Sequence, residues 1–186
     1  MANPAKRART IALIVCVTAA AALPAAAQVR NSGASPIALK ALLAESLSVS
    51  LSANAVSFNL IGGSAVNPGN TSITATTTWT VTQPRTLSVY AYFSSATSAL
   101  TDGAGDNIPS SAFQISDNGG AFNALVNTVP FGGANAGRRL ARVRIGLGAA
   151  TGKRTDTMNF NINLSALPNL PAGSYTGILN IQAQAI

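Results

Sequence analysis

Few side chains in this sequence of 186 residues could do acid–base or metal chemistry. It contains no histidine, and Cys16 is its single cysteine, which removes most nucleophile–base pairs and the usual zinc and copper sites. A glycosidase needs two carboxylates that face each other across a cleft. Most of the five carboxylates here stand in predicted turns, far apart in the chain: Glu45, Asp102, Asp106, Asp117 and Asp156. A Ser–Lys pair through Lys40 or Lys153 would stand outside any nucleophile motif. We therefore expect no enzyme.

Asp102, Asp106 and Asn107 are the best candidates for metal ligands. Calcium takes several oxygen ligands from a flexible loop, and Gly103 and Gly105 would let the backbone curl around the ion. The spacing does not match an EF-hand loop, and an ordinary turn prefers the same residue types. The sequence leaves a calcium site and a purely structural loop as alternatives.

Tyr90 and Tyr92 stand two residues apart in a predicted strand, so they share one of its faces. Two exposed rings could form a platform for carbohydrate. The same pair is also ordinary cross-strand packing. The two tyrosines are therefore candidate ligand-binding residues with a structural alternative.

Arg142 and Arg144 share one face of another predicted strand, in a region that holds six of the nine Lys and Arg residues of positions 28–186. This region could contact an anionic envelope polymer or lipid head groups. Alternatively, the charges protect a sheet edge from unwanted pairing. Nine basic residues against five acidic ones leave a net charge of only +4 over these positions, so we do not expect nucleic acid as a partner.

Alternating apolar and polar residues predict an all-β chain of eight or nine short strands. The clearest segments are 47–53, 73–82, 87–94, 113–115, 139–147, 157–164 and 175–185. Such strands, separated by Gly- and Pro-rich turns, predict an immunoglobulin-like antiparallel β-sandwich closed by its final strand. We expect segments 73–82 and 87–94 to form a hairpin, and residues 148–155 to form a β-turn rather than a phosphate-binding loop.

Residues 1–27 have the three parts of a cleavable signal peptide. Lys6, Arg7 and Arg9 are basic, an apolar run follows, and small alanines precede Gln28. The apolar run is too short to span a membrane, and no second hydrophobic span follows. We expect export to the periplasm, the cell surface or the extracellular space, with a flexible leader at 28–36 and a single sandwich domain at 37–186. Segment 37–44 fits a strand better than a helix, because its apolar residues alternate.

The turn formed by Pro171, Ala172, Gly173, Tyr175 and Gly177 leads into the alternating final strand. This sequence motif resembles the C-terminal ends of bacterial surface β-sandwiches, including spore coat U-like, fimbrial-type and WxL-type domains. The resemblance implies a secreted, non-enzymatic, immunoglobulin-like domain that assembles on the cell surface.

The leading hypothesis is a structural or interaction protein of the bacterial cell envelope, such as a pilin-like or surface-assembly subunit. It would associate with itself or with another envelope protein through strand-edge pairing, with residues 28–43 donating a strand. The alternative is a carbohydrate- or calcium-dependent ligand-binding module.

Overall fold

The computed structural model describes residues 36–41, 44–82, 84–146 and 150–186. The chain divides into two units, 1–40 and 41–186. In the first unit, described residues 36–40 form neither helix nor strand. Residues 41 and 44 also lie outside any strand, so the strand expected at 37–44 is wrong for its described residues. The predicted signal peptide lies outside the described residues.

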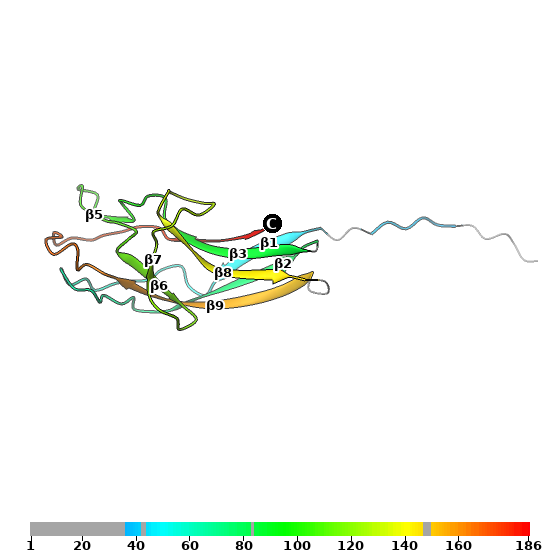
Figure 1. Cartoon of the computed structure of the whole chain (residues 1–186), viewed down its shortest axis with the longest axis horizontal. Coiled ribbons are helices and arrows are strands. Elements are labelled where there is room, and N and C mark those ends of the chain that lie inside the picture. The colour runs from blue at the N-terminus through cyan, green and yellow to red at the C-terminus, as the bar shows by residue number, and fades with distance from the viewer. Residues whose placement is uncertain (1–35, 42–43, 83, 147–149) are drawn as a thin grey trace, which may run out of the picture. The chain divides into compact units, whose positions relative to one another are not determined.

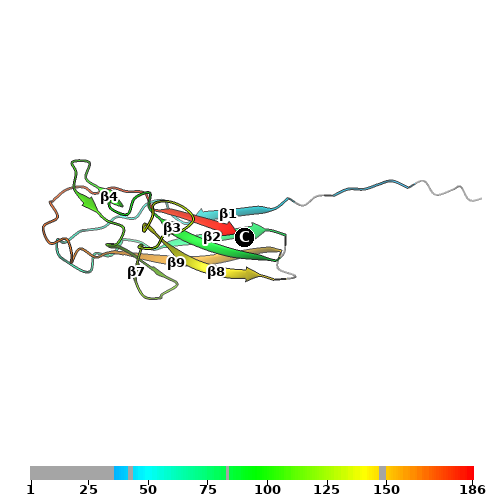
Figure 2. The ribbon, with the colours of Figure 1, turned by 45° about the horizontal axis from the view of Figure 1, so that its top comes forward.

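The second unit is an antiparallel β-sandwich without a helix among its described residues. The larger sheet has the order β1 (Ser46–Leu51), β2 (Ile73–Thr80), β9 (Thr151–Ile162), β6 (Phe113–Asp117) and β7 (Asn123–Ala124). The smaller sheet has the order β10 (Asn180–Ala185), β3 (Arg85–Tyr92) and β8 (Gly137–Ile145). A two-stranded ribbon joins β4 (Leu100–Thr101) to β5 (Asn107–Ile108). The long strands of both sheets lie along roughly the same axis (Figures 1 and 2), as in an aligned sandwich.

The buried core follows the alternation of the sequence. On β2, Ile73, Ala75 and Trp79 are buried, and on β9 Met158 and Phe160 are buried. Successive strand residues point to opposite faces, so one face of each strand enters the space between the sheets. The all-β prediction and the principal predicted strands are confirmed.

The hairpin predicted between segments 73–82 and 87–94 is wrong. β2 pairs with β1 and β9, whereas β3 pairs with β10 and β8. The two consecutive strands therefore lie in different sheets and contribute to the core from opposite sides. Alternation reports which face of a strand is buried, but it does not report which strand lies beside it.

The turn predicted at 148–155 is also wrong for much of its length. Thr151–Thr155 belong to β9 and pair with β2 as far as Thr80. Gly152 lies opposite Trp79, and a Cβ added at Gly152 would stand 2.4 Å from Trp79 Cζ2. The glycine that resembled a turn residue instead makes room for the indole ring on the neighbouring strand.

Residues 117–120, Asp-Asn-Gly-Gly, form the tight turn that this sequence favours. Asn118 and Gly119 both have positive φ angles, 51° and 77°, and the amide of Gly120 donates to the carbonyl of Asp117 at 2.9 Å. This is the geometry of a type I′ turn, which suits antiparallel strands. The Asn118 amide group also donates to Asp156 Oδ1 at 2.8 Å, so the turn is tied to β9.

Candidate functional site

A groove follows the side of the sandwich where the edge strands β1 and β10 face each other. Its middle part is a cleft of about 300 Å³ between residues 51–58, at and after the end of β1, and residues 177–181, at and before the start of β10. A hollow of about 270 Å³ lies between β1 and β10 themselves and shares Ile181 with the cleft. A third hollow, of about 540 Å³, shares Phe58 and Leu100 with the cleft. The three hollows thus succeed one another along the gap between the sheets.

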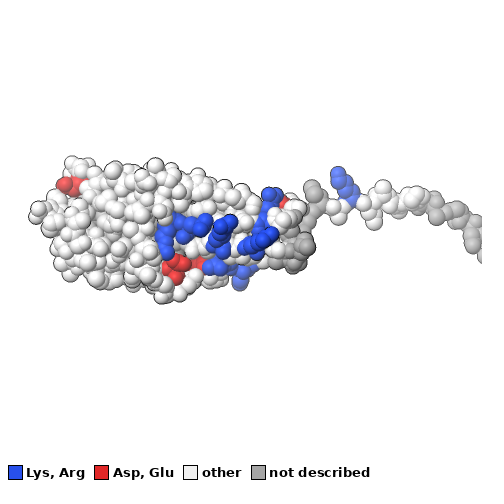
Figure 3. All heavy atoms as spheres, in the orientation of Figure 1, with Lys and Arg blue, Asp and Glu red and all other residues white. Residues whose placement is uncertain are grey.

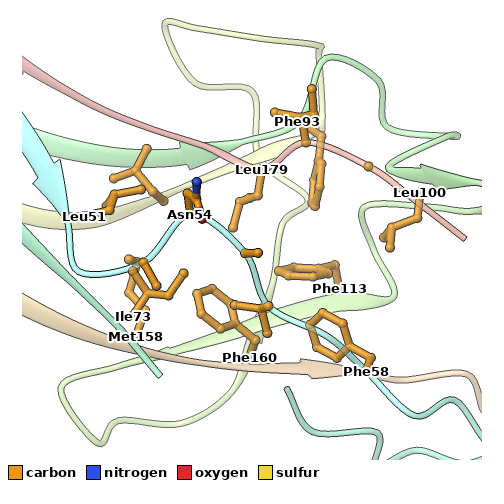
Figure 4. Close-up of a pocket in the computed structure, with 16 residues that line it drawn as sticks. Leu51, Asn54, Phe58, Ile73, Phe93, Leu100, Phe113, Met158, Phe160 and Leu179 are labelled. Carbon is orange, nitrogen blue, oxygen red and sulfur yellow. The ribbon is translucent and has the colours of Figure 1, made fainter. Parts of the chain in front are cut away.

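Four phenylalanine rings, two from strands of the larger sheet and two from connecting segments, line the cleft (Figure 4). Phe113, at the start of β6, is their centre. Its ring centroid lies 5.8 Å from Phe58, 5.1 Å from Phe93 and 6.0 Å from Phe160. The contacts with Phe58 and Phe93 are edge-to-face, a favourable arrangement for aromatic pairs. Phe93 and Phe160 belong to the buried core, so the cleft opens directly onto it.

The backbone along both walls of the cleft has free hydrogen-bonding groups. The amides and carbonyls of residues 53–56, and those of Gly177 and Ile178, form no hydrogen bond with other described residues. Leu51 and Ile178 at the cleft are 43% and 77% exposed. An exposed edge with free backbone groups is a template for pairing with another strand.

None of the described residues that line the cleft can titrate. Asn54 is the one lining residue with a polar side chain among them, and it lies at the exposed rim. Such a surface can bury apolar groups and pair with a backbone. It offers no acid, base or charged metal ligand.

The predicted ligand-binding tyrosines lie on the outer face of the smaller sheet. Tyr90 is only 9% exposed, and its ring meets Phe131 edge-to-face at 5.9 Å. Tyr92 lies 5.8 Å from the same ring, and its hydroxyl donates to Gln182 Oε1 at 2.7 Å. Phe131 therefore packs against both tyrosines, and the pair is less open than an exposed platform would be. A single phenylalanine in a Gly-rich loop was the only sequence signal for this third ring.

The predicted metal ligands form a compact turn between β4 and β5. Asp102 Oδ1 accepts hydrogen bonds from the amides of Ala104, Gly105 and Asp106 at 2.8, 3.1 and 3.0 Å. These bonds, with that of Ala104 first, hold the pKa of Asp102 below its usual value. Asn107 donates to the carbonyl of Gly105 at 2.9 Å. Hydrogen bonds within the loop thus explain Asp102 and Asn107 without a metal ion, and calcium binding stays a prediction.

The other carboxylates are held by cations. Asp117 lies 3.3 Å from Arg138 Nη2, and Glu45 lies 3.4 Å from Arg85. Asp156 is 1% exposed and accepts from Arg154 Nε at 2.7 Å. Within the described parts of the chain, no group of three or more His, Cys, Asp or Glu residues could hold a metal ion.

The residues of the predicted basic region divide between β8, in the smaller sheet, and β9, in the larger sheet. Arg142 and Arg144 are exposed on β8, which is an edge strand of the smaller sheet. Figure 3 shows Lys and Arg gathered over one part of this face, while most of the remaining visible surface carries no charge. Both readings of the sequence, a charged edge and a contact surface, are compatible with this position.

Across the residues that the structure describes, no helix is long and apolar enough to cross a membrane. Comparison of the chain with protein-family models, curated proteins and solved structures found no match in any of the three.

Proposed function

We propose that this protein is an exported, non-enzymatic structural subunit of the bacterial cell envelope that assembles by strand addition. In this proposal, segment 37–43 of one copy lies in the groove between β1 and β10 of another. The observation that carries the proposal is the groove itself, because it combines an apolar floor with free backbone groups on both walls.

The chemistry of segment 37–43 matches that of the groove. Ile37, Leu39, Ala41 and Leu43 alternate with other residues, so in an extended conformation their side chains would share one face. Ile37 and Leu39 are 82% and 91% exposed. Burying each of these side chains would stabilise the assembly by about 1.5–3 kcal/mol.

Backbone hydrogen bonds would fix the register of the added segment against the wall of the groove. A strand added beside residues 53–56 would provide partners for their free amides and carbonyls. Apolar side chains at alternate positions would then enter the cleft lined by the phenylalanines. Main-chain hydrogen bonds give affinity and the pockets for alternate side chains give specificity in this mode of recognition.

Size-exclusion chromatography with light scattering tests the proposal. We expect residues 28–186 to form oligomers and residues 45–186 to lose them. In the longer chain, Leu39→Asp should weaken association because it puts a charge into the apolar cleft. The matched control is Ala38→Asp, which adds the same charge on the opposite face of the segment.

A second variant addresses the groove. Ala55 is exposed and lines the cleft, so Ala55→Trp should fill it without changing a core residue and should also weaken association. Oligomers that survive both Leu39→Asp and Ala55→Trp would show that assembly uses another surface. A chain 28–186 that stays monomeric would contradict assembly of this protein by itself.

A further inference from the structure

The outer face of the smaller sheet carries a row of three arginines that alternation alone does not predict. Residues 139 and 142 are an odd number of positions apart, so in a regular strand they would point to opposite faces. A bulge in β8 changes this, because the pairing shifts between Val89 and Tyr90. Arg139 pairs with Tyr90, and Arg142 pairs with Ser88.

The bulge places two successive residues of β8 in the core. Leu140 and Ala141 are both 8% exposed. Because both side chains point inward, every residue after them points to the face opposite to the one that regular alternation predicts. Arg139, Arg142 and Arg144 consequently share the outer face, and all three are exposed. Arg142 and Arg144 are spaced by about 7 Å along the strand.

The row has no carboxylate side chain to neutralise it. All five acidic residues of the chain are described, and three of them form ion pairs with Arg85, Arg138 and Arg154. The remaining two, Asp102 and Asp106, lie in the turn between β4 and β5. The bulge also separates Arg138 from the row, since Arg138 donates to the carbonyl of Ile115 at 2.7 Å.

Hydrogen-bonding side chains accompany the arginines across the sheet. Tyr90 and Ser88 on β3, opposite Arg139 and Arg142, pair on their other side with Gln182 and Gln184 of β10. Gln182 is exposed. Ser88 and Tyr90 are buried, so the amide group of Gln182 is the polar group that this row presents to a ligand beside the arginines. An amide suits the hydroxyls of a sugar chain, while the guanidinium groups suit its carboxylates.

We infer that this face, defined by Arg139, Arg142, Arg144 and Gln182, binds an acidic polysaccharide. Double-stranded DNA fits it less well, because three arginines neutralise few phosphates compared with the six to ten contacts of typical DNA-binding proteins. A lipid surface fits it less well because the partners of the row on the central strand are Thr86, Ser88 and Tyr90 rather than aliphatic side chains. The inference does not depend on the proposed strand addition.

Binding of the full chain to alginate oligosaccharides, a polyuronate, tests the inference, with dextran as the neutral reference. We expect saturable binding to alginate that weakens with salt. Arg142→Gln should weaken it about fivefold, as for one exposed ion pair. The triple variant Arg139→Gln, Arg142→Gln and Arg144→Gln should weaken it about a hundredfold if the three contacts act independently.

Lys153→Gln is the matched control, because it removes the same charge from an exposed strand residue of the other sheet. It should change alginate binding less than twofold, and thermal melts should show all variants folded. The inference is overturned if alginate does not bind, or if Lys153→Gln weakens binding as much as Arg142→Gln. Equal or tighter binding to a DNA duplex or to phosphatidylglycerol vesicles would also overturn it and would identify the other class of partner.

Discussion

Asn67 is a buried polar residue whose hydrogen-bonding groups all have partners. Its side chain accepts from the amide of Ile61 at 2.7 Å and donates to the carbonyls of Ile162 and Ser64 at 2.8 and 3.1 Å. Its own amide donates to Asn161 Oδ1 at 2.8 Å. Asn67 therefore fastens the loop before β2 to the end of β9.

We expect Asn67→Ala to lower the free energy of unfolding by about 2–4 kcal/mol, because it leaves buried backbone groups without partners. Urea unfolding followed by circular dichroism measures the change. Asn59→Ala is the control, since Asn59 is exposed, and it should stay within about 0.5 kcal/mol of the unchanged protein. Similar effects of the two substitutions would contradict the structural role of Asn67.

Particular residues show what could be inferred at this scale from the sequence. Asn and Gly are the residue types that tolerate positive φ, so the turn at Asn118 and Gly119 was predictable. Asn67 precedes Pro68 and Gly69 and looks in the sequence like part of an ordinary turn, because nothing local to it reveals the distant carbonyl of Ile162. The aromatic ring of Phe131 was missed for the same reason, since its contacts with Tyr90 and Tyr92 join a loop to a strand far away in the chain.

At the scale of elements, β2 and β9 are held closely together where Trp79 crosses Gly152. Any side chain at position 152 must displace the indole ring or the strand, because an added Cβ would lie 2.6 Å from Trp79 Cε2. We expect Gly152→Ala to destabilise the protein by about 1–3 kcal/mol through overpacking and to change the fluorescence of Trp79, the single tryptophan.

Gly146→Ala is the control for Gly152→Ala, because it makes the same substitution at a glycine outside β2 and β9. Nothing lies within 4 Å of a Cβ added at Gly146, so the substitution should be nearly neutral or slightly stabilising. If Gly152→Ala proved as harmless as Gly146→Ala, the close contact between β2 and β9 would be wrong.

The pairing of the strands could not be predicted from their patterns. Segment 87–94 has a polar outer face and an apolar inner face, and this is equally compatible with a hairpin or with a place in a second sheet. The bulge in β8 was hidden for a related reason. Leu140 and Ala141 are both apolar, which reads as a local break in alternation until the register with Val89 and Tyr90 is known. The candidate groove also depends on tertiary packing, so no pattern in the sequence groups its lining residues.

For the molecule as a whole, the small number of charges limits how stability depends on pH. The chain has no histidine, so no side chain of ordinary pKa titrates between about pH 5 and 8. A hydrogen bond from Thr82 lowers the pKa of Glu45, and the amide of Ala104 is the main group that lowers the pKa of Asp102.

A carboxyl group with a lowered folded-state pKa stabilises the fold above its unfolded-state pKa, and this contribution is lost as the pH falls through the folded-state value. We expect the urea midpoint to be steady at neutral pH and to decrease below about pH 4. Asp102→Asn keeps an oxygen for the turn but removes the titrating group, so its acid decrease should be smaller. A decrease that begins near pH 6.5 would contradict this account.

The placement of the final strand has a consequence for the time course of folding. β10 completes the smaller sheet by pairing with β3, and its Gln182 meets Tyr92 across a sequence separation of 90 residues. In the larger sheet, β2 likewise pairs with β9, which follows it by 71 residues in the chain. Such non-local pairing gives a high contact order, and sandwiches of this kind fold in milliseconds to seconds rather than microseconds. Neither principal sheet can be completed before its C-terminal strand, β9 or β10, has been synthesised at about 5–20 residues per second. For the exported protein that we propose, this delay would keep the chain unfolded, and so able to be translocated, until it has left the cytoplasm.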